Sequence, residues 1–482
     1  MTIAFRSAED LAGMIRRREI GAVELLELYF GRIDTLDATI NAVIWQDREG
    51  ALETARAADS RTVTGDDLPP LHGVPMTIKE SFDVAGAPTT WGDPAFRDNV
   101  ARHDCVAVER LKRAGVTLFG KTNVPLNLAD WQSFNDIYGI TSNPWDTGRT
   151  PGGSSGGSAA ALAAGLTGIE TGSDIGASIR NPAHYCGVFG HKPSFGICPP
   201  RGQALPGVLT GADMAVIGPL ARSAGDLEVA LNVLAGPDVL DAAGWRLELP
   251  ARRARKLADL RVAVMLESGL SEVDGPYLDM LQDLVDGIAR TGATLSDAAR
   301  PDIDMRDAHE TYIQLLRAAT SARLPQDRLE DFQAARARLD PGDASYFALM
   351  TRGNTMTHRE WMALNERREH IRWAWHRFFD DWDILISPVA ASTAFPHDHS
   401  GERHDRTIPV NGHEAPTTDQ MFWAGFGLMA LLPGTVAPAG ISRDGLPGGI
   451  QITGPWLGDL TTIEAARLIE REFGGFQPPS GF

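Results

Sequence analysis

The sequence predicts an α/β fold in which one mixed central sheet is covered by helices on both faces. Short apolar runs typical of interior strands alternate with amphipathic stretches of helical period along most of the chain. No repeat and no low-complexity linker divides the 482 residues. The segment from about 300 to 380 differs, because it is rich in Arg, Asp and Glu, and we expect it to form a helical insertion or cap.

The expected helices and strands follow one another along the chain. "SAED" (7–10) has the pattern of a capping box that opens an N-terminal helix, and "AVELLELYFGRIDTL" (22–36) predicts a second helix. "GVPMTIKESFDV" (73–84) begins as a short apolar strand and continues into a polar loop. In "CVAVERLKRAGVTLFGKTN" (105–123) a helix ends at Gly115 and a strand follows. The remaining elements are interior strands in 259–268 and 382–389, and helices near 275–291 and 461–473.

Charge and composition argue against several classes of protein. The formal net charge of −18 disfavours binding to nucleic acid and to anionic membranes. Cys105, Cys186 and Cys198 form no C-x-x-C pair, which favours a reducing, cytoplasmic setting over a disulfide framework or a zinc site. The first 30 residues lack the apolar core of a signal peptide. Prolines and glycines interrupt the uncharged stretch 421–442, so we expect a buried helix and strand there rather than a membrane span.

"PGGSSGGSAAALAAGL" (151–166) joins a Gly/Ser-rich loop to a predicted helix and allows three interpretations. A flexible linker is disfavoured, because the run opens a helix between strand-like segments. A phosphate-binding loop needs a lysine after its last glycine, and none follows Gly157. "GGSSG" matches the G-x-S-x-G pattern of a hydrolase nucleophile elbow centred on Ser154. That interpretation also needs a late histidine, and nothing distinguishes one of His358, His370, His397, His399, His404 and His413.

A second glycine-rich turn and a lysine decide between these interpretations. "TGSDIGASIRNPAHYCGVFGHKPSFG" (171–196) places Ser178 24 residues after Ser154, and "TIKES" places Lys79 at the end of an apolar strand. Together with "KTNVP", "NPWDTGRTPGGSSGGSAAALAAG", "GPLARSAGDL" and "GLPGGIQITGP", these stretches resemble the amidase signature family over nearly the whole chain. Within that family the chain looks most like bacterial amidases, aryl acylamidases and urethanases.

The resemblance implies a Ser–cis-Ser–Lys hydrolase in a single amidase-signature domain over residues 1–482. Lys79 matches the family's general base, Ser178 its nucleophile, and Ser154 the proton relay, which in the family follows a cis peptide bond. Lysine serves as a base only if its pKa falls toward neutrality from about 10.4. The oxyanion is expected to bind the backbone N–H groups of Ile175, Gly176, Ala177 and Ser178. The expected parts of the domain are an N-terminal helical part (1–70), a catalytic core (71–240) and the insertion (about 300–380).

One position departs from the family pattern. The nucleophile turn usually reads Asp-x-Gly-Gly-Ser, and Ala177 replaces the second glycine here. Its Cβ restricts the backbone if φ is positive at this position, and otherwise narrows the space above the oxyanion hole. Ser155 and Ser173 are expected to support the site by hydrogen bonds, and Asp174 and Arg180 by a bracing ion pair. His184 and His191 are expected to pack or cap, since this mechanism uses no histidine.

The family lines its acyl pocket with the segment between "KTNVP" and "NPW", here "LNLADWQSFNDIYGITS" (126–142). Leu128 and Trp131 would face the substrate with Asp130 nearby, although Trp131 equally suits packing of the loop against the body. The lack of arginine in this segment and the acidic surface favour a small neutral, apolar or aryl amide such as an anilide, with carbamates and esters as further substrates. We expect no cofactor, no metal and a monomer or homodimer. The alternative is the glutaminase subunit of a tRNA-dependent amidotransferase, which would need a partner protein.

Overall fold

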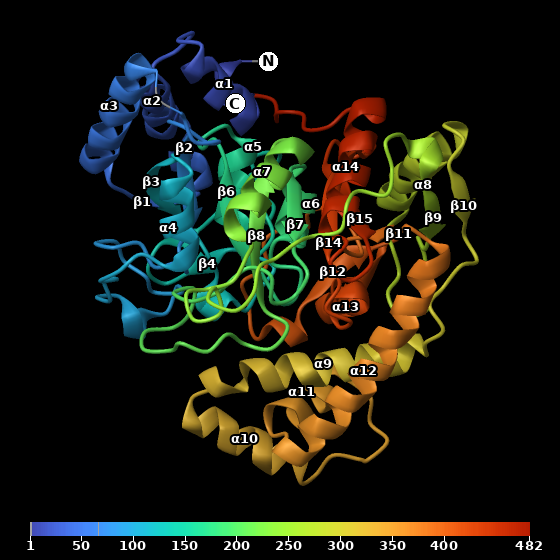
Figure 1. Ribbon diagram of the computed structural model, residues 1–482. Helices are drawn as coiled ribbons and strands as arrows, with labels where there is room; N and C mark the ends of the chain where they lie inside the picture. Colours follow the sequence, from blue (N-terminus) through green and yellow to red (C-terminus); the bar gives the residue numbers. More distant parts are fainter. Residues whose placement is uncertain (1, 66) are drawn as a thin grey trace.

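An eight-stranded mixed sheet forms the centre of the protein (Figure 1). The computed structural model describes residues 2–65 and 67–482. The strands of this sheet are β6 (Glu170–Asp174), β7 (Phe189–Lys192), β8 (Val216–Ala221), β9 (Arg261–Val264), β10 (Thr294–Ser296), β11 (Ile384–Pro388), β14 (Gly434–Ile441) and β15 (Pro447–Thr453). Their order is β10-β9-β11-β15-β14-β7-β8-β6. β9 pairs in parallel with β10 and β11, and the other neighbouring strands pair antiparallel.

A three-stranded sheet lies beside β6. It places the carboxyl end of its strand β2 next to the carboxyl end of β6. Its strands are β1 (Val43–Gln46), β3 (Thr117–Thr122) and β2 (Pro75–Lys79), in the order β1-β3-β2. A parallel bridge from Met76 to Ile169 joins β2 to the residue before β6. Because both strands run in the same direction from this bridge, their carboxyl ends, Lys79 and Asp174, lie at one edge. Two short hairpins are β4 (Phe134–Asn135) with β5 (Gly139–Ile140), and β12 (Thr407–Val410) with β13 (His413–Pro416).

Helices cover both faces of the large sheet. The helices are α1 (Ala8–Arg16), α2 (Ala22–Ile40), α3 (Arg48–Thr64), α4 (Val106–Arg113), α5 (Gly156–Ala163), α6 (Arg180–Cys186), α7 (Ala224–Leu234), α8 (Gly275–Arg290), α9 (Met305–Thr320), α10 (Gln326–Arg336), α11 (Tyr346–Asn354), α12 (His358–Asp381), α13 (Met421–Leu428) and α14 (Asp459–Phe473). Side chains alternate along β7, so the side chains of neighbouring residues lie on opposite faces of the sheet. A Cβ added at Gly190 would meet Ala183 of α6 at 2.8 Å, whereas the His191 ring contacts Asp459 of α14 at 3.1 Å. The two helices therefore lie on opposite faces, which confirms the predicted α/β architecture.

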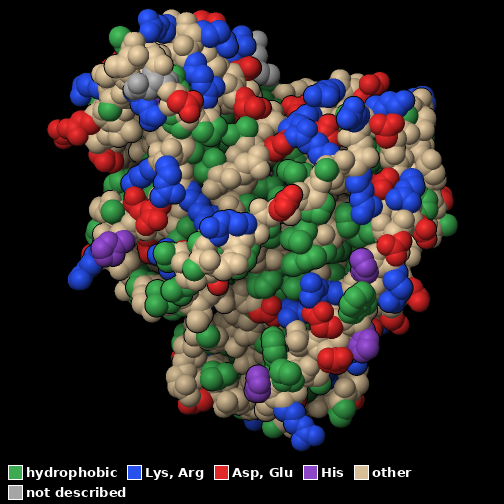
Figure 2. All heavy atoms as spheres, viewed as in Figure 1, with side chains coloured by type: hydrophobic (Ala, Val, Ile, Leu, Met, Phe, Trp, Pro, Cys, Tyr) green, Lys and Arg blue, Asp and Glu red, His purple; other side chains and the backbone are tan. Residues whose placement is uncertain are grey.

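Helices α9 to α12 form a group beside the sheet, at the bottom of Figure 1. They occupy the Arg-, Asp- and Glu-rich segment for which the sequence predicts a helical insertion. α9 packs against α11 and α12 on one side and against α13 of the body on the other. On the face seen in Figure 2, acidic and basic side chains are interspersed over both the body and this group. The division of the chain at residues 70, 240, 300 and 380 stays a prediction.

Local sequence signals agree with the elements that form. The Ser7 hydroxyl caps α1 by accepting a hydrogen bond from the Asp10 N–H at 3.1 Å, as the capping pattern predicts. The uncharged stretch 421–442 contains the buried helix α13 and the whole of β14, whose first five residues are buried, which confirms that prediction. Within residues 2–65 and 67–482, no helix combines the length and apolar character needed to cross a bilayer.

Candidate active site

Three polar side chains from separate segments meet at the carboxyl ends of β2 and β6. Lys79 is the last residue of β2, Ser173 lies in β6, and Ser154 lies in the Gly/Ser-rich loop before α5. The Nζ of Lys79 donates hydrogen bonds to Ser154 Oγ at 2.6 Å and to Ser173 Oγ at 3.0 Å. The peptide bond between Gly153 and Ser154 is cis. Lys79 and Ser154 are both buried, so their contact is shielded from water.

Burial gives Lys79 the pKa of a usable base. Removal from water penalises the ammonium form and lowers the pKa of Lys79 to about 7; the charge of Arg323 lowers it further, while those of Asp174 and Glu170 oppose the shift. A lysine with this pKa is roughly half neutral at neutral pH. Across the 2.6 Å contact, the hydroxyl of Ser154 can then donate its proton to the neutral amine.

The glycines around Ser154 allow close approach of backbone to backbone. A Cβ added at Gly153 would lie 2.2 Å from the carbonyl oxygen of Asp130, and one added at Gly157 would lie 2.4 Å from the N of Asn123. No real side chain tolerates such distances, so only glycine fits. α5 begins at Gly156 and is buried along its whole length. The Gly/Ser-rich run is therefore a packed loop and helix start, and the linker interpretation is excluded.

The turn that carries Ser178 is braced by one buried carboxylate. Asp174 accepts hydrogen bonds from the N–H groups of Ala177 at 2.9 Å and Ile179 at 3.1 Å. Its side chain also pairs with the Arg180 guanidinium at 3.0 Å. Burial alone would raise the pKa of Asp174, but Arg180 outweighs it and holds this pKa below its usual range. Asp174 and Arg180 thus form the brace that the sequence predicts, and the carboxylate keeps its charge.

Three of the four expected oxyanion donors are free to bind a ligand. Within the described part of the chain, the N–H groups of Ile175, Gly176 and Ser178 have no hydrogen-bond acceptor. The N–H of Ala177 differs, because it already donates to Asp174. The expected hole therefore reduces to Ile175, Gly176 and Ser178, with Ala177 serving the brace instead. The physical reason is the left-handed backbone at Ala177, where φ is +68°.

The sequence left two effects of the Ala177 Cβ open: restriction of the backbone, or narrowing of the space above the oxyanion hole. The positive φ observed at Ala177 shows that the Cβ restricts the backbone. A β-branched residue is a genuine outlier in this conformation, so Ala177→Val should lower the free energy of unfolding by about 2 kcal/mol or more. Ala177→Gly should stay within about 1 kcal/mol of the parent, because relief of the left-handed conformation offsets the greater freedom of glycine when unfolded. Urea denaturation measures both.

Ala183, in the middle of α6, is the matched control for this pair of substitutions. Glycine has no conformational advantage in a helix, so Ala183→Gly should cost about 1 kcal/mol. A chain that tolerates valine at position 177 but loses stability with glycine there would contradict the left-handed assignment.

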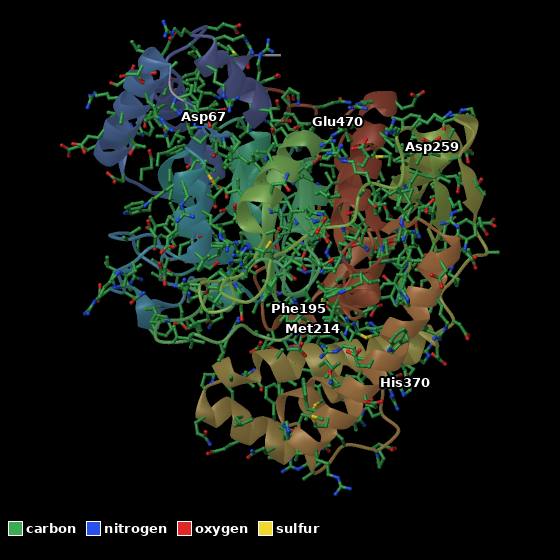
Figure 3. All side chains as sticks on the ribbon, in the orientation of Figure 1. Asp67, Phe195, Met214, Asp259, His370 and Glu470 are labelled. Carbon is green, nitrogen blue, oxygen red and sulfur yellow. The ribbon has the colours of Figure 1, made fainter. Side chains whose placement is uncertain are left out.

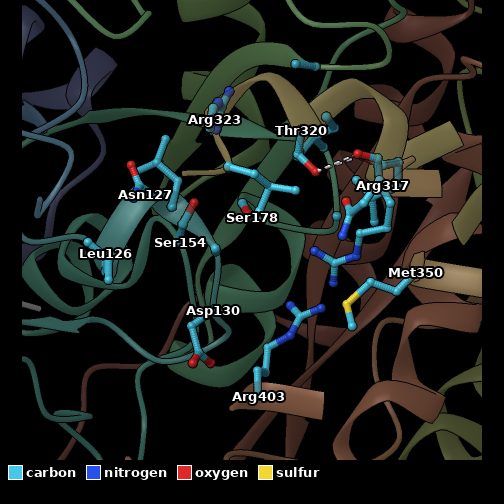
Figure 4. A pocket seen from close by; sticks show the side chains of 18 of the residues that line it. Leu126, Asn127, Asp130, Ser154, Ser178, Arg317, Thr320, Arg323, Met350 and Arg403 are labelled. Carbon is cyan, nitrogen blue, oxygen red and sulfur yellow. Dashed lines mark hydrogen bonds between the residues drawn. The ribbon is translucent and has the colours of Figure 1, made fainter. Parts of the chain in front are cut away.

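A cavity of about 430 Å³ opens onto the catalytic residues. Ser154, Ser173 and Ser178 line one wall of it, and Gln203, which donates to Ser173 Oγ at 3.2 Å, lies beside them. The facing wall comes from α9, α10, α11 and the segment before β12, as Figure 4 shows for Arg317, Thr320, Met350 and Arg403. Further side chains that line the cavity are Trp91, Leu128, Asp130, Trp131, Leu316, Arg323, Arg328, Phe332, Glu402 and Met421. The helical group therefore closes the site that the sheet edge presents.

The three residues expected to contact substrate all line this cavity, but two of them have partners within the protein. Trp131 is 3% exposed, and its indole N–H donates to the carbonyl oxygen of Gly176 at 2.7 Å. Asp130 pairs with Arg406 at 2.6 Å. Leu128 is half-buried and offers an apolar side chain. Trp131 thus braces the nucleophile turn, in line with its expected packing role, while it also forms part of the wall.

Residues 126–142, from which the substrate class was predicted, form only one wall of the cavity. Residues 126–142 contain no arginine, as the sequence shows. Four arginines from other segments nevertheless line the cavity, namely Arg317, Arg323, Arg328 and Arg403. The absence of arginine from residues 126–142 therefore does not extend to the cavity as a whole. The Arg-rich composition of 300–380 is the available signal for three of these four arginines, but composition alone does not say which way a helix faces.

The histidines do not form a nucleophile elbow with Ser154. Of the six candidates, only His404 lines the cavity, and none of the six hydrogen-bonds to Ser154. His370 projects outward from α12 in Figure 3 and its side chain is 79% exposed. His184 contacts the Ser392 carbonyl at 3.0 Å, and His191 contacts Thr435 at 2.8 Å, so both are held by structural contacts. Among the described residues, no three His, Cys, Asp or Glu side chains are placed to hold a metal ion.

Comparison with known proteins gives a family match over most of the chain. Residues 24–463 match the family model described as Amidase. The chain is 34% identical to an indoleacetamide hydrolase of Bradyrhizobium diazoefficiens, over 97% of this chain and 86% of that protein. It is 31% identical to an acylamidase of Rhodococcus erythropolis, over 96% of this chain and 94% of that protein. It is 32% identical to a subunit of the glutamyl-tRNA(Gln) amidotransferase of Acidothermus cellulolyticus, over 97% of this chain and 94% of that protein.

Solved structures share the fold over the whole chain. A bacterial aryl acylamidase of the amidase signature family superposes with a TM-score of 0.81 at 24% identity, over 98% of this chain and 96% of that chain. A 6-aminohexanoate cyclic dimer hydrolase bound to its substrate superposes with a TM-score of 0.80 at 25% identity, over 99% of each chain. The sheet and its helices are thus an arrangement that proteins with differently named substrates share.

Proposed function

Because this chain belongs to the amidase signature family of C–N bond hydrolases, we propose that it cleaves amides through an acyl-enzyme on Ser178. Lys79 is the base and Ser154 the proton relay. The observation that carries the proposal is the buried 2.6 Å hydrogen bond between Lys79 and Ser154, in surroundings that lower the pKa of Lys79 to about 7. A relay hydroxyl beside a neutral amine is what a serine nucleophile requires.

The proposed reaction has two halves that use the same proton path. Ser178 Oγ attacks the amide carbonyl carbon while its proton passes to Ser154, whose own proton passes to Lys79. The tetrahedral oxyanion accepts hydrogen bonds from the free N–H groups of the turn, each worth roughly 3 kcal/mol to the transition state. The C–N bond then breaks, and the amine leaves with the proton returned from Lys79 through Ser154. Water attacks the acyl-enzyme by the reverse route and releases a carboxylic acid and free Ser178.

The substrate we propose has a small apolar or aryl body. Leu128, Leu316, Phe332, Met350 and Met421 supply apolar surface to the cavity, whose volume suits a small molecule. Carbamates and esters present the same carbonyl to the nucleophile, so they are proposed as further substrates. We also propose a cytoplasmic location, which the free, buried state of all three cysteines supports.

The glutaminase subunit of an amidotransferase is the second candidate function. The chain is 31% identical to the acylamidase and 32% identical to one such subunit, so identity does not separate the two. The carboxylates of the cavity support the amide hydrolase over the glutaminase subunit. Glutamine brings an α-ammonium group, and the three carboxylates lining the cavity already pair with Arg180, Arg328 or Arg406. We therefore propose that glutamine is a poor substrate.

A hydrolysis panel tests this choice. It compares 4-nitroacetanilide, an aryl carbamate, an aryl ester and glutamine at equal concentrations with the purified chain. We expect the anilide, the carbamate and the ester to be cleaved and glutamine to be cleaved at least tenfold more slowly. Efficient glutamine hydrolysis without turnover of the other three would overturn the proposed substrate class in favour of the amidotransferase subunit.

The pH dependence of hydrolysis follows from Lys79. The proposed mechanism needs the neutral amine, and the pKa of Lys79 is lowered to about 7, so kcat/KM should rise through about pH 7 and level off above it. The charge of Arg323 contributes to this lowering, so Arg323→Gln should move the inflection to higher pH. Initial rates with a non-ionising anilide between pH 5 and 10 measure both.

An exposed arginine provides the control for the pH experiment. Arg443 lies on the surface, paired with Asp279 at 3.5 Å, and does not line the cavity. Arg443→Gln should leave the inflection unchanged. A rate that falls as pH rises through 7 would contradict the role of Lys79.

A further inference from the structure

The cavity is lined by more arginines than its carboxylates can pair with. Asp130, Asp174 and Glu402 are its three carboxylates, and each pairs with an arginine. Among the four lining arginines, only Arg328 has a carboxylate partner, Glu402 at 3.0 Å. Within residues 2–65 and 67–482, no carboxylate pairs with the other three, Arg317, Arg323 and Arg403. The cavity thus holds an excess of positive charge inside a protein whose net charge is −18.

Arg317 and Arg403 converge on a single hydroxyl group. Both guanidinium groups donate to the hydroxyl of Tyr346, that of Arg403 at 3.0 Å. Figure 4 shows the side chains of Arg317 and Arg403 approaching each other beside Met350. The Nε of Arg317 is buried and has no hydrogen-bond partner among the described residues. Two positive charges thus lie close together around the phenol of Tyr346, and the Nε–H of Arg317 has no acceptor among the described residues.

The charges of the two arginines also act on the phenol of Tyr346. Burial alone would raise the pKa of this phenol, but the charges of Arg317 and Arg403 outweigh it and the pKa falls below its usual value. Arg323 adds a third positive charge from the turn after α9, with its guanidinium 4.5 Å from the centre of the Trp91 ring. The guanidinium of Arg323 makes no hydrogen bond or ion pair to the described residues.

Unpaired guanidinium groups away from bulk water are costly unless an anion balances them. We propose that Arg317 and Arg403 form a subsite for a carboxylate carried by the amide substrate, at the end of its apolar body. This inference rests on the proposed function. The planar fork of each guanidinium matches a carboxylate, and two forks around one point hold it in a fixed orientation. The proposed substrate carries this carboxylate but no ammonium group next to it, because every carboxylate of the cavity already pairs with an arginine.

Two pairs of anilides test the subsite and locate the carboxylate. N-glutaryl-4-nitroanilide carries it on the acyl side and is compared with N-pentanoyl-4-nitroanilide. 5-Acetamido-2-nitrobenzoate carries it on the leaving amine and is compared with 4-nitroacetanilide. We expect one carboxylated member to exceed its neutral partner at least tenfold in kcat/KM, the effect of one or two charge-assisted hydrogen bonds. Equal or lower kcat/KM for both carboxylated members would overturn the subsite.

Arginine variants assign the preference to residues. Arg317→Gln and Arg403→Gln should each reduce the carboxylated-to-neutral ratio about tenfold, mainly through KM, while the neutral anilide is still cleaved and so reports a folded site. Arg317→Lys should restore part of the ratio, since it keeps the charge but not the fork. Arg328→Gln is the matched control, because Arg328 lines the same cavity but is balanced by Glu402. It should leave the ratio unchanged. If the carboxylated-to-neutral ratio stays unchanged in Arg317→Gln and Arg403→Gln, these arginines only position Tyr346 and the subsite is wrong.

A binding measurement separates this inference from the proposed function. Calorimetry of the Ser178→Ala variant with N-glutaryl-4-nitroanilide and 5-acetamido-2-nitrobenzoate reports the subsite without turnover. If the wild type cleaves neutral anilides but neither carboxylated probe binds more tightly than its neutral partner, the subsite alone fails. If no anilide is cleaved but a carboxylated probe binds at least tenfold more tightly, the proposed function alone fails.

Discussion

Replacing Ser178 by alanine is expected to abolish amide hydrolysis, with kcat falling by roughly 10⁴-fold or more. Ser178 lies in the braced turn between Asp174 and Arg180 and lines the cavity beside three free N–H groups. Without its Oγ no acyl-enzyme can form, and the remaining groups can only polarise the carbonyl. Steady-state rates on 4-nitroacetanilide, together with the absence of a burst of nitroaniline, measure the loss.

Ser155 and Ser154 provide graded controls for this result. Ser155 is buried next to the relay, but its hydroxyl has no hydrogen-bond partner among the described residues, so the expected hydrogen-bonded support from Ser155 is wrong. Ser155→Ala should therefore stay within about threefold of the parent. Ser154→Ala should cost about 10²- to 10⁴-fold and leave a trace of activity, because the nucleophile and base remain. Persisting turnover in Ser178→Ala, with loss in Ser154→Ala, would favour the elbow interpretation centred on Ser154.

Replacing Lys79 by methionine is expected to lower kcat/KM by about 10²- to 10⁴-fold. Methionine keeps most of the buried volume but has no proton acceptor of useful basicity, so Ser154 loses the group that takes its proton. The loss of an inflection near pH 7 should accompany the loss of rate, since that inflection is assigned to Lys79. The full pH–rate profile of the variant measures both effects.

Lys112 is the control for the lysine substitution. It lies on α4 and pairs with Asp104 at 2.7 Å, with 44% of its side chain exposed. Lys112→Met should leave both the rate and the pH profile unchanged. If Lys79→Met kept an inflection near pH 7 at full rate, another group would be the base.

Residues that act through short sequence patterns could be predicted from the sequence. Asp174 precedes the N–H groups it binds by three to five residues, so local geometry brings these partners together. Lys79 ends an apolar run of strand type, but its partner Ser154 lies 75 positions away, and its role was predicted from the family resemblance. The helix that opens after Ser154 is likewise a local event. The α/β class followed from the alternation of such elements.

Contacts between distant segments could not be predicted in the same way. Arg317 and Arg403 reach the cavity only because α9 packs against α13 and the segment before β12 turns back to it. The bond from Trp131 to Gly176 spans 45 positions, and its direction depends on how the loop settles on the turn. The left-handed backbone at Ala177, which turns its N–H toward Asp174, is not revealed by the residue type alone.

The most direct test of the central claim is to map the serine that a fluorophosphonate labels in the intact chain. Peptide mass spectrometry after labelling should place the adduct on Ser178, with labelling that accelerates through about pH 7 as Lys79 loses its proton. The Lys79→Met variant should label far more slowly at the same position. An adduct on Ser154 instead of Ser178 would contradict the assignment of nucleophile and relay.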